Sequence, residues 1–153
     1  MEAQQGPAHA SPRQGAQGRR DSTVIALARA QLGRRYLFGG NTPDGFDCSG
    51  FVRYLMRAVG VETPRTAAQI AGAGREVPRD VSQLRIGDIL TFGRGRVSHV
   101  GIYVGNGRYI HASTGAGRIV EASLDRPASP LVKAWHGVRR MLDADSGTAV
   151  AQR

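Results

Sequence analysis

Three residues of this sequence have the chemistry needed for catalysis by sulfur: Cys48, which is the only cysteine, His99 and His111. A thiolate attacks carbonyl carbon atoms, and an imidazole beside it can take the thiol proton and return it later. A second polar group must hold that imidazole in the productive tautomer. We therefore interpret Cys48 as a nucleophile, His99 as its base and His111 as the residue that orients His99. The alternative is that these are a small buried cysteine and two structural strand histidines.

The residues around Cys48 predict that it begins a helix. Asp47 can cap the first turn by accepting a backbone N–H. A thiol at this position faces the positive end of the helix dipole, which favours the thiolate, and the first backbone N–H groups could hold an oxyanion. Tyr36, in the preceding loop, could add a phenolic donor or pack as an ordinary aromatic residue. The apolar residues that follow recur at helical spacing and stop before Gly60: Phe51, Val52, Leu55, Met56 and Val59.

The two histidines lie on strands predicted on either side of Gly105-Asn106-Gly107. A two-residue turn would pair Gly105 with Arg108 and put the histidines on opposite faces of the hairpin. A three-residue loop with a bulge at Gly107 would instead pair Val104 with Arg108 and place both rings on one face. Their backbones would then be about 7–8 Å apart on diagonal positions, which imidazole rings can bridge. The same-face arrangement is the one that our interpretation of the histidines requires.

The rest of the chain predicts one folded domain, 21–142, between two tails. Residues 1–20 have no apolar periodicity and residues 143–153 are polar, so we expect both segments to be flexible. A helix is predicted from Ser22, as its N-cap, to Gly33, and a short helix after Thr66. Strands are expected over 87–92, 97–104, 109–113, 117–122 and 134–141. Helices first and strands later, without βαβ alternation, predict an α+β fold with N-terminal helices packed on an antiparallel sheet.

The composition narrows the range of partners. The chain has 21 Lys+Arg against 12 Asp+Glu, for a net charge of +9, which suits an anionic partner. The arginines are scattered and are not interleaved with stacking aromatics, so nucleic-acid binding is not expected. No apolar run approaches the roughly 20 residues that span a bilayer, and no signal peptide is recognised in this chain. A single cysteine excludes an internal disulfide.

The order and spacing of several motifs resemble those of the NlpC/P60 cell-wall peptidases, over roughly residues 22–142. The motifs around the nucleophile are Tyr36-Leu37-Phe38-Gly39-Gly40, Asp47-Cys48-Ser49-Gly50-Phe51 and Pro64-Arg65-Thr66. The motifs of the sheet are Leu84-Arg85-Ile86-Gly87-Asp88, Ser98-His99-Val100-Gly101-Ile102-Tyr103, Gly105-Asn106-Gly107 and Tyr109-Ile110-His111-Ala112-Ser113. Phe38 departs from the family pattern, in which tryptophan is common, and we expect this to alter the shape of the cleft.

This resemblance implies a papain-like α+β fold and a cysteine endopeptidase that hydrolyses peptidoglycan stem peptides through a thioester acyl-enzyme. It implies no cofactor and no metal. The usual target is the bond between γ-D-glutamate and a diamino acid, commonly meso-diaminopimelate. Carried over by position, Cys48 is the nucleophile, His99 the base and His111 the third catalytic residue. The positions that match oxyanion or substrate-contacting residues are Tyr36, Asp47, Ser49 and Ser98.

Two other functions remain open at this point. A papain-like relative could act as an amidase or acyltransferase on a different carbonyl, or the domain could be a catalytically idle wall-binding module. The complete set of Cys48, His99 and His111 favours an enzyme over a binding module. The resemblance further implies peptidoglycan or muropeptides as partners and an exported, periplasmic or wall-associated protein. The basic charge predicts electrostatic association with the wall or a membrane surface.

Overall fold

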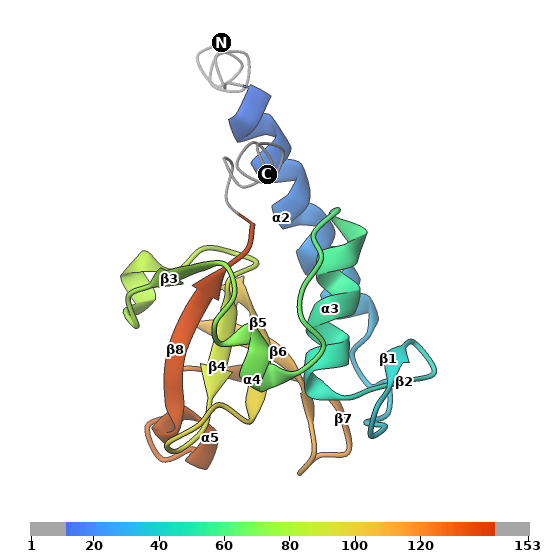
Figure 1. Ribbon diagram of the computed structural model, residues 1–153, viewed down its shortest axis with the longest axis vertical. Helices are drawn as coiled ribbons and strands as arrows, with labels where there is room; N and C mark the ends of the chain where they lie inside the picture. Colours follow the sequence, from blue (N-terminus) through green and yellow to red (C-terminus); the bar gives the residue numbers. More distant parts are fainter. Residues whose placement is uncertain (1–11, 143–153) are drawn as a thin grey trace.

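A computed structural model describes residues 12–142, in which two helices cover one face of a six-stranded sheet (Figure 1). The helices are α2 (Pro12–Ala30) and α3 (Cys48–Ala58). The sheet has the order β3-β8-β4-β5-β6-β7, with every neighbouring pair antiparallel. Its strands are β3 (Arg75–Val77), β4 (Ile89–Phe92), β5 (His99–Gly105), β6 (Arg108–Ser113), β7 (Arg118–Ser123) and β8 (Trp135–Arg140). The predicted α+β class is therefore confirmed, and the five predicted strands are present as β4 to β8.

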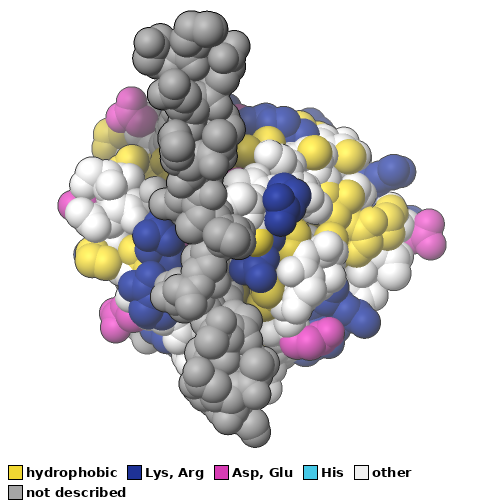
Figure 2. Space-filling view, turned by 90° about the horizontal axis from the view of Figure 1, so that it is seen from above, with side chains coloured by type: hydrophobic (Ala, Val, Ile, Leu, Met, Phe, Trp, Pro, Cys, Tyr) yellow, Lys and Arg dark blue, Asp and Glu magenta, His cyan; other side chains and the backbone are white. Residues whose placement is uncertain are grey.

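On the face of the molecule seen from above (Figure 2), positive charge is not gathered in one block. Figure 2 shows the molecule from above, with Lys and Arg side chains standing at several separate places among hydrophobic and neutral residues. No helix within residues 12–142 is both long enough and apolar enough to cross a membrane.

The helix α2 begins earlier than predicted. It starts at Pro12, so Ser22 lies inside it as an exposed residue and is not its N-cap, and Pro12–Arg20 is helical rather than an irregular tail. Once a helix is anchored, each added residue gains one backbone hydrogen bond, and proline is well suited to its first turn. Residues 1–11 and 143–153 lie outside the described residues, so the predicted tails and domain limits stay predictions.

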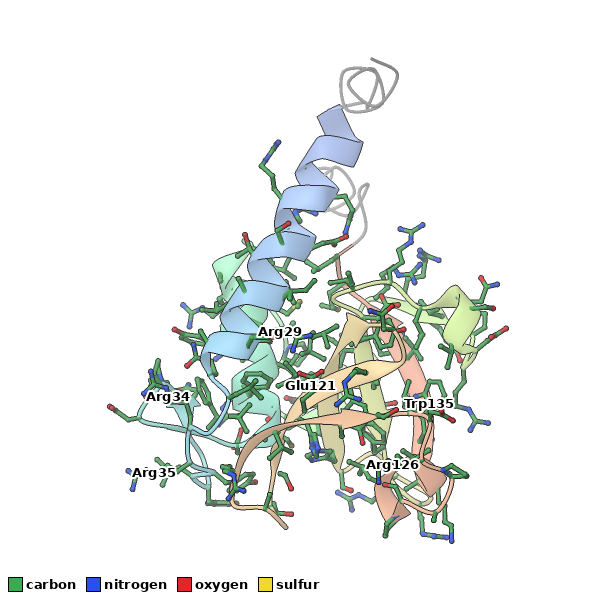
Figure 3. The ribbon with its side chains drawn as sticks, turned by 180° about the vertical axis from the view of Figure 1, so that it is seen from behind. Arg29, Arg34, Arg35, Glu121, Arg126 and Trp135 are labelled. Carbon is green, nitrogen blue, oxygen red and sulfur yellow. The ribbon has the colours of Figure 1, made fainter. Side chains whose placement is uncertain are left out.

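The C-terminal half of α2 attaches the helix to the rest of the domain. Val24 and Ala28 are fully buried. The helix was predicted to run to Gly33 but ends at Ala30, and Leu32 beyond it is 40% exposed. Figure 3 shows Arg29 beside Glu121 of β7, with which it forms an ion pair. The helix is thus held by apolar burial and by a charge contact with β7.

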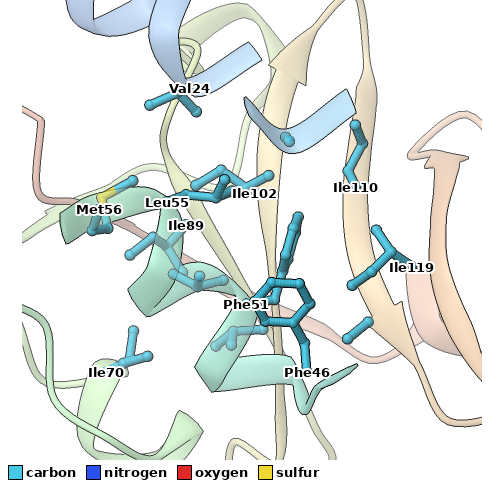
Figure 4. Packing of buried hydrophobic residues seen from close by; sticks show 14 of the residues in the cluster. Val24, Phe46, Phe51, Leu55, Met56, Ile70, Ile89, Ile102, Ile110 and Ile119 are labelled. Carbon is cyan, nitrogen blue, oxygen red and sulfur yellow. The ribbon is translucent and has the colours of Figure 1, made fainter. Parts of the chain in front are cut away.

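The main hydrophobic core lies between the helices and one face of the sheet. Phe51 and Leu55 of α3 are completely buried against Ile102 of β5 and Ile110 of β6 (Figure 4). Each such side chain contributes about 1.5–3 kcal/mol by leaving water. A second apolar cluster covers the opposite face of the sheet: Val77, Leu90, Phe92, Tyr103, Tyr109, Leu124 and Val138. Burial on both faces holds the strands rigidly in place.

The turn between β5 and β6 differs from the predicted three-residue loop. Gly105 pairs with Arg108, so Asn106 and Gly107 form a two-residue turn in which φ is 56° and 73°. Positive φ at both central positions is typical of a type I′ turn, which favours Asn-Gly. The predicted pairing of Val104 with Arg108 is therefore wrong.

A bulge between Tyr103 and Gly105 then shifts the register by one residue. Beyond it Tyr103 pairs with Tyr109, and the same register continued brings His111 beside Gly101. In agreement, a Cβ added at Gly101 would lie 3.1 Å from the Cβ of His111. The two histidines consequently share one face, as predicted, through a tight turn plus a bulge instead of a longer loop.

Short elements complete the fold. The short helix predicted after Thr66 is present as α4 (Ala67–Ile70), and Thr66 forms a capping box with Gln69 at its start. The strand β3 was not among the predicted strands, and it pairs with β8. Four more elements were not predicted: β1 (Asn41–Thr42), β2 (Gly45–Phe46), the 3₁₀ helix η1 (Val81–Gln83) and α5 (Pro130–Lys133). Pieces of two to four residues are too short to show a periodic pattern.

Candidate active site

Five of the seven predicted site residues line one cleft of about 610 Å³. They are Tyr36, Cys48, Ser98, His99 and His111. The loop at 113–115, between β6 and β7, and residues 129–131, at the start of α5, form other parts of its wall. Cys48 is the first residue of α3, whereas the histidines come from β5 and β6. The cleft therefore forms where the N-terminus of a helix meets the face of a hairpin.

The two histidine rings are in direct contact. Nε2 of His99 lies 2.8 Å from Nδ1 of His111, and the ring planes are nearly perpendicular at 86°. A neutral imidazole has one donor and one acceptor nitrogen, so one ring must donate and the other accept. If Nε2 of His99 carries the proton, Nδ1 of the same ring is left as a free base. His111 can thus select the tautomer of His99 that a neighbouring thiol needs.

The sulfur of Cys48 faces the backbone on both sides of His99. It lies 4.0 Å from the carbonyl oxygen of Ser98, which accepts its S–H, and the N–H of Val100 donates towards it. These contacts tie the start of α3 to the start of β5. The nucleophile and the histidine pair are consequently held by rigid elements rather than by loops.

The pKa of the Cys48 thiol contradicts the prediction of a thiolate in the resting site. We expected the helix start to favour a thiolate, but burial raises the pKa of the Cys48 thiol, and the negative charge of Asp47 adds to this effect. Backbone N–H groups, including that of Val100, oppose the rise and do not overcome it. Loss of hydration around a buried anion outweighs the stabilisation by these backbone N–H groups.

Both histidines are held in the neutral state. Burial, and then the proximity of His111, lower the pKa of His99 to about 3. Burial lowers the pKa of His111 to about 4. Near neutral pH the site therefore holds a thiol and two uncharged imidazoles. The sulfur can become a strong nucleophile only when its proton moves to a ring nitrogen.

Close backbone contact positions the N-terminus of α3. The N–H of Asp47 donates to the carbonyl oxygen of Gly40 at 2.9 Å. A Cβ on Gly50 would lie 2.0 Å from that same oxygen, so no other residue fits there without moving the loop. The two glycines thereby let the loop before the helix lie directly against its first turn, beside Cys48.

Asp47 and Ser49, the two other predicted site residues, are not among the residues that line the cleft. The carboxylate of Asp47 caps the helix by accepting the N–H of Gly50 at 2.7 Å. It also accepts two hydrogen bonds from Arg65, at 3.1 Å and 3.0 Å, and Arg65 donates to the hydroxyl of Ser49 at 2.9 Å. These residues form a charged network beside the nucleophile.

Arg65 is a residue of this site to which the sequence analysis assigned no role. It belongs to the Pro64-Arg65-Thr66 motif, but nothing in the spacing shows that its guanidinium reaches Asp47 across a loop. The paired geometry, with two parallel N–H donors on one carboxylate, is the strong form of this contact. Arg65 therefore fixes the cap, and through it the start of the helix that carries Cys48.

The aromatic residues of the loop before Cys48 behave differently from one another. Tyr36 is half-buried in the cleft, and burial raises its pKa, with the charges of Cys48 and Asp47 adding to this effect. Phe38 is 92% exposed and does not line the cleft, so the expected effect of this residue on the cleft shape is absent. Tyr36 is thus the aromatic residue of this loop that can meet a substrate in the cleft.

Among the described residues, no group of three or more His, Cys, Asp or Glu side chains is arranged to hold a metal ion. The residues that the cleft brings together offer the chemistry of a thiol and a base with an orienting partner.

Comparison with known proteins agrees with the family resemblance of the sequence motifs. The profile of the NlpC/P60 family matches residues 33–140. The chain is 46% identical over 91 residues to "Probable endopeptidase p60" of Listeria monocytogenes, covering 58% of this chain and 18% of that protein. It is 42% identical over 112 residues to "Murein DD-endopeptidase MepS/Murein LD-carboxypeptidase" of Escherichia coli, covering 72% of this chain and 57% of that protein. The matched part of the chain thus spans less than two thirds of the length of these relatives.

Solved structures agree with the fold. The peptidoglycan hydrolase RipB of Mycobacterium tuberculosis superimposes with a TM-score of 0.72 at 30% identity, covering 90% of this chain and 71% of that one. An NlpC/P60 family protein of Bacillus cereus gives a TM-score of 0.73 at 29% identity, covering 80% of this chain and 40% of that one.

Proposed function

Because the chain belongs to the NlpC/P60 family, we propose that it is a cysteine endopeptidase that hydrolyses peptidoglycan stem peptides. The observation that carries this proposal is the hydrogen bond between Nε2 of His99 and Nδ1 of His111, in the cleft that Cys48 also lines. A ring held by a second ring, next to a thiol, is the general design of an activated sulfur nucleophile. The names of the relatives in Listeria and Escherichia, both endopeptidases, further support it.

The first step of the proposed reaction forms a thioester. Sγ of Cys48 attacks the carbonyl carbon while its proton moves to Nδ1 of His99, which gives a tetrahedral intermediate. His99 then gives this proton to the leaving nitrogen, the C–N bond breaks, and the amine departs. His111 accepts the N–H of His99 throughout and stabilises the imidazolium that forms. Since the resting thiol is uncharged, the proton transfer and the attack are coupled.

The second step restores the enzyme. A water molecule replaces the departed amine, and Nδ1 of His99 takes its proton as the oxygen attacks the thioester. The C–S bond breaks, the proton passes to sulfur, and the acid product leaves. In both steps the backbone N–H of Cys48, which as the first helical residue has no partner inside the helix, is the leading oxyanion donor. The hydroxyl of Tyr36 is the second.

The bond that we propose for cleavage joins γ-D-glutamate to a diamino acid, with meso-diaminopimelate as the leading candidate. The relative in Escherichia carries a name that refers to other murein bonds, so a different bond in the same polymer is the first alternative. An amidase, an acyltransferase or a catalytically idle wall-binding module are the others. Action on the wall would take place outside the cytoplasmic membrane, where the basic surface of the chain could associate with anionic polymers.

Digestion of defined muropeptides tests this proposal. The wild type should release a peptide that starts with the diamino acid and leave a new D-glutamyl carboxyl terminus, both identified by mass. Cys48→Ala should release nothing. A released sugar would support the amidase, and a transferred acyl group the acyltransferase. If both proteins are inactive on every muropeptide but bind purified sacculi equally, the binding module is the better description.

A further inference from the structure

A second hollow opens directly beside the cleft. It has a volume of about 560 Å³ and lies along β6, β7 and the loop that follows. We call it the arginine pocket; its lining residues are Arg108, Tyr109, Glu121, Ala122, Ser123, Arg126, Pro127, Ala128 and Ser129. Tyr109, Ala122 and Ser129 also line the cleft. The two hollows are therefore neighbours that share one wall.

The arginine pocket carries unused positive charge. Glu121, its one acidic lining residue, is already engaged: Arg108 donates to it through Nε at 2.6 Å, and Arg29 pairs with its other oxygen. Burial alone would raise the pKa of Glu121, but these two arginines hold that pKa below its usual value. Arg126 is exposed, and no side chain or carbonyl among residues 12–142 accepts a hydrogen bond from its guanidinium.

The chemistry of the site indicates on which side of the scissile bond the pocket lies. His99 must give its proton to the leaving amine, so the leaving group lies on the histidine side of Cys48. His111 contacts Tyr109, whose ring centre is 5.1 Å away, and Tyr109 is a shared wall of the pocket. Tyr109 pairs with Ala122, and Arg108 pairs with Ser123 one step further along the strands. The pocket thus continues the cleft on the leaving-group side.

We propose that the arginine pocket binds a carboxylate of the leaving peptide, through the guanidinium of Arg126. This inference rests on the proposed function. The strand from His111 to Tyr109, the wall that the two hollows share, covers two residues, roughly 7 Å, and Arg126 lines the same pocket as Tyr109. A leaving dipeptide spans about 7 Å when extended, and a long arginine side chain can supply the rest. Charge-assisted bonds from a guanidinium suit a planar carboxylate.

Two carboxylates of such a peptide fit this description. One stands at the end of the side chain of diaminopimelate, and lysine differs from diaminopimelate only by lacking it. The other is the terminal carboxylate of the alanine that follows. In either case the pocket recognises the anionic group after the scissile bond, and it favours substrates that carry one.

The experiment measures binding and hydrolysis separately. Calorimetry with Cys48→Ala measures the affinity of three dipeptides: meso-diaminopimelyl-D-alanine, its terminal amide, and L-lysyl-D-alanine. Steady-state kinetics with an intact nucleophile measures kcat/KM for the matching stem peptides. Arg126→Gln is tested in both assays. Arg57→Gln is the matched control, because Arg57 lies near the far end of α3, about 13 Å along the helix axis from Cys48.

We expect one carboxylate to increase affinity and kcat/KM by about tenfold, the range of a charge-assisted hydrogen bond. Arg126→Gln should remove most of that preference, while hydrolysis of the substrate that lacks this carboxylate stays unchanged, and Arg57→Gln should keep it. If Arg126→Gln loses the preference for the diaminopimelyl peptide over the lysyl peptide, the pocket binds the side-chain carboxylate. If it loses the preference for the free acid over the terminal amide, the pocket binds the terminal carboxylate. The proposed role of the pocket is overturned if the wild type binds and hydrolyses all three kinds of peptide equally well. It is also overturned if the preference survives in Arg126→Gln. Arginine-dependent binding without any hydrolysis supports the pocket and overturns the proposed function.

Discussion

Nε2 of His99 and Nδ1 of His111 lie 2.8 Å apart, which leaves Nδ1 as the only nitrogen of His99 that can serve a thiol. The neutral His99 ring can have its proton on Nε2 or on Nδ1, and only the first form leaves a base for Cys48. An acceptor at the position of His111 selects that form. The role of His111 is therefore to accept, and a side chain that can accept should replace it in part.

Asparagine at position 111 is the first test of this division of roles. His111→Asn offers a side-chain oxygen as acceptor, so we expect it to retain a measurable part of kcat on muropeptides. His111→Leu has a similar size and no acceptor, and it should lose about 10²–10⁴-fold, as should His99→Ala. The measurement is kcat and KM for each variant. Equal losses in the asparagine and leucine variants would mean that acceptance of the N–H is not what His111 contributes.

The raised pKa of the Cys48 thiol predicts how the free enzyme reacts with alkylating reagents. Because burial raises the pKa above the ordinary 9.0, the thiolate fraction should be small at neutral pH and should increase about tenfold per pH unit. Iodoacetamide should therefore label the protein slowly at pH 6 and much faster at pH 9, and labelling should abolish hydrolysis. Cys48 is the only cysteine, so Cys48→Ala gives the background. A labelling rate that is flat from pH 5 to pH 8 would instead indicate a preformed thiolate–imidazolium pair.

The lowered histidine pKa values predict a loss of stability in acid. Burial lowers the pKa of His99 to about 3 and that of His111 to about 4, from an ordinary value of 6.5. Below pH 6.5 the unfolded chain binds protons that the folded chain does not. The free energy of unfolding contributed by these residues is thus fully present above pH 6.5 and decreases as the pH falls towards 3.

Chemical denaturation at a series of pH values measures this effect. The free energy of unfolding of the wild type should decrease between pH 6.5 and pH 4, and the slope should be smaller in His99→Gln and His111→Gln. The slope is the useful quantity, since each variant has its own stability at neutral pH. Identical slopes in all three proteins would show that the two rings titrate in the folded state as they do in the unfolded chain.

The parts of this site that the sequence could predict are those that follow local rules. The helix after Asp47 was predictable because a capping residue, helical apolar spacing and a terminal glycine all agree, and four of its five predicted apolar residues are fully buried. The contact of Arg65 with Asp47 was not predictable, because it crosses a loop whose path depends on the whole fold. The same limit applies to the thiol pKa, since the helix dipole is a local effect and burial is not.

The hairpin shows a different reason for error. The Asn106-Gly107 pair favoured a two-residue turn, and this turn is present, but on its own it would have put the histidines on opposite faces. A bulge at Val104 reverses that outcome. Since side chains alternate with a period of two, a single extra residue decides the face, and no pattern in the sequence marks where it is inserted. The face of the histidines followed from the chemistry that they were expected to share, rather than from the turn.

The contact between Gly50 and Gly40 gives a prediction about stability that does not involve catalysis. A Cβ on Gly50 would lie 2.0 Å from the carbonyl oxygen of Gly40, so Gly50→Ala must move either the loop or the helix. Overpacking of this kind costs about 1–3 kcal/mol, and the cap at Asp47 would be disturbed as well. Gly18→Ala is the control: Gly18 lies in α2 with nothing within 4 Å of an added Cβ, so alanine there should stabilise by about 0.5–1 kcal/mol. Urea denaturation measures both changes. Equal stability of Gly50→Ala and the wild type would show that the loop before Cys48 is free to move away, and would remove the reason for a glycine at that position.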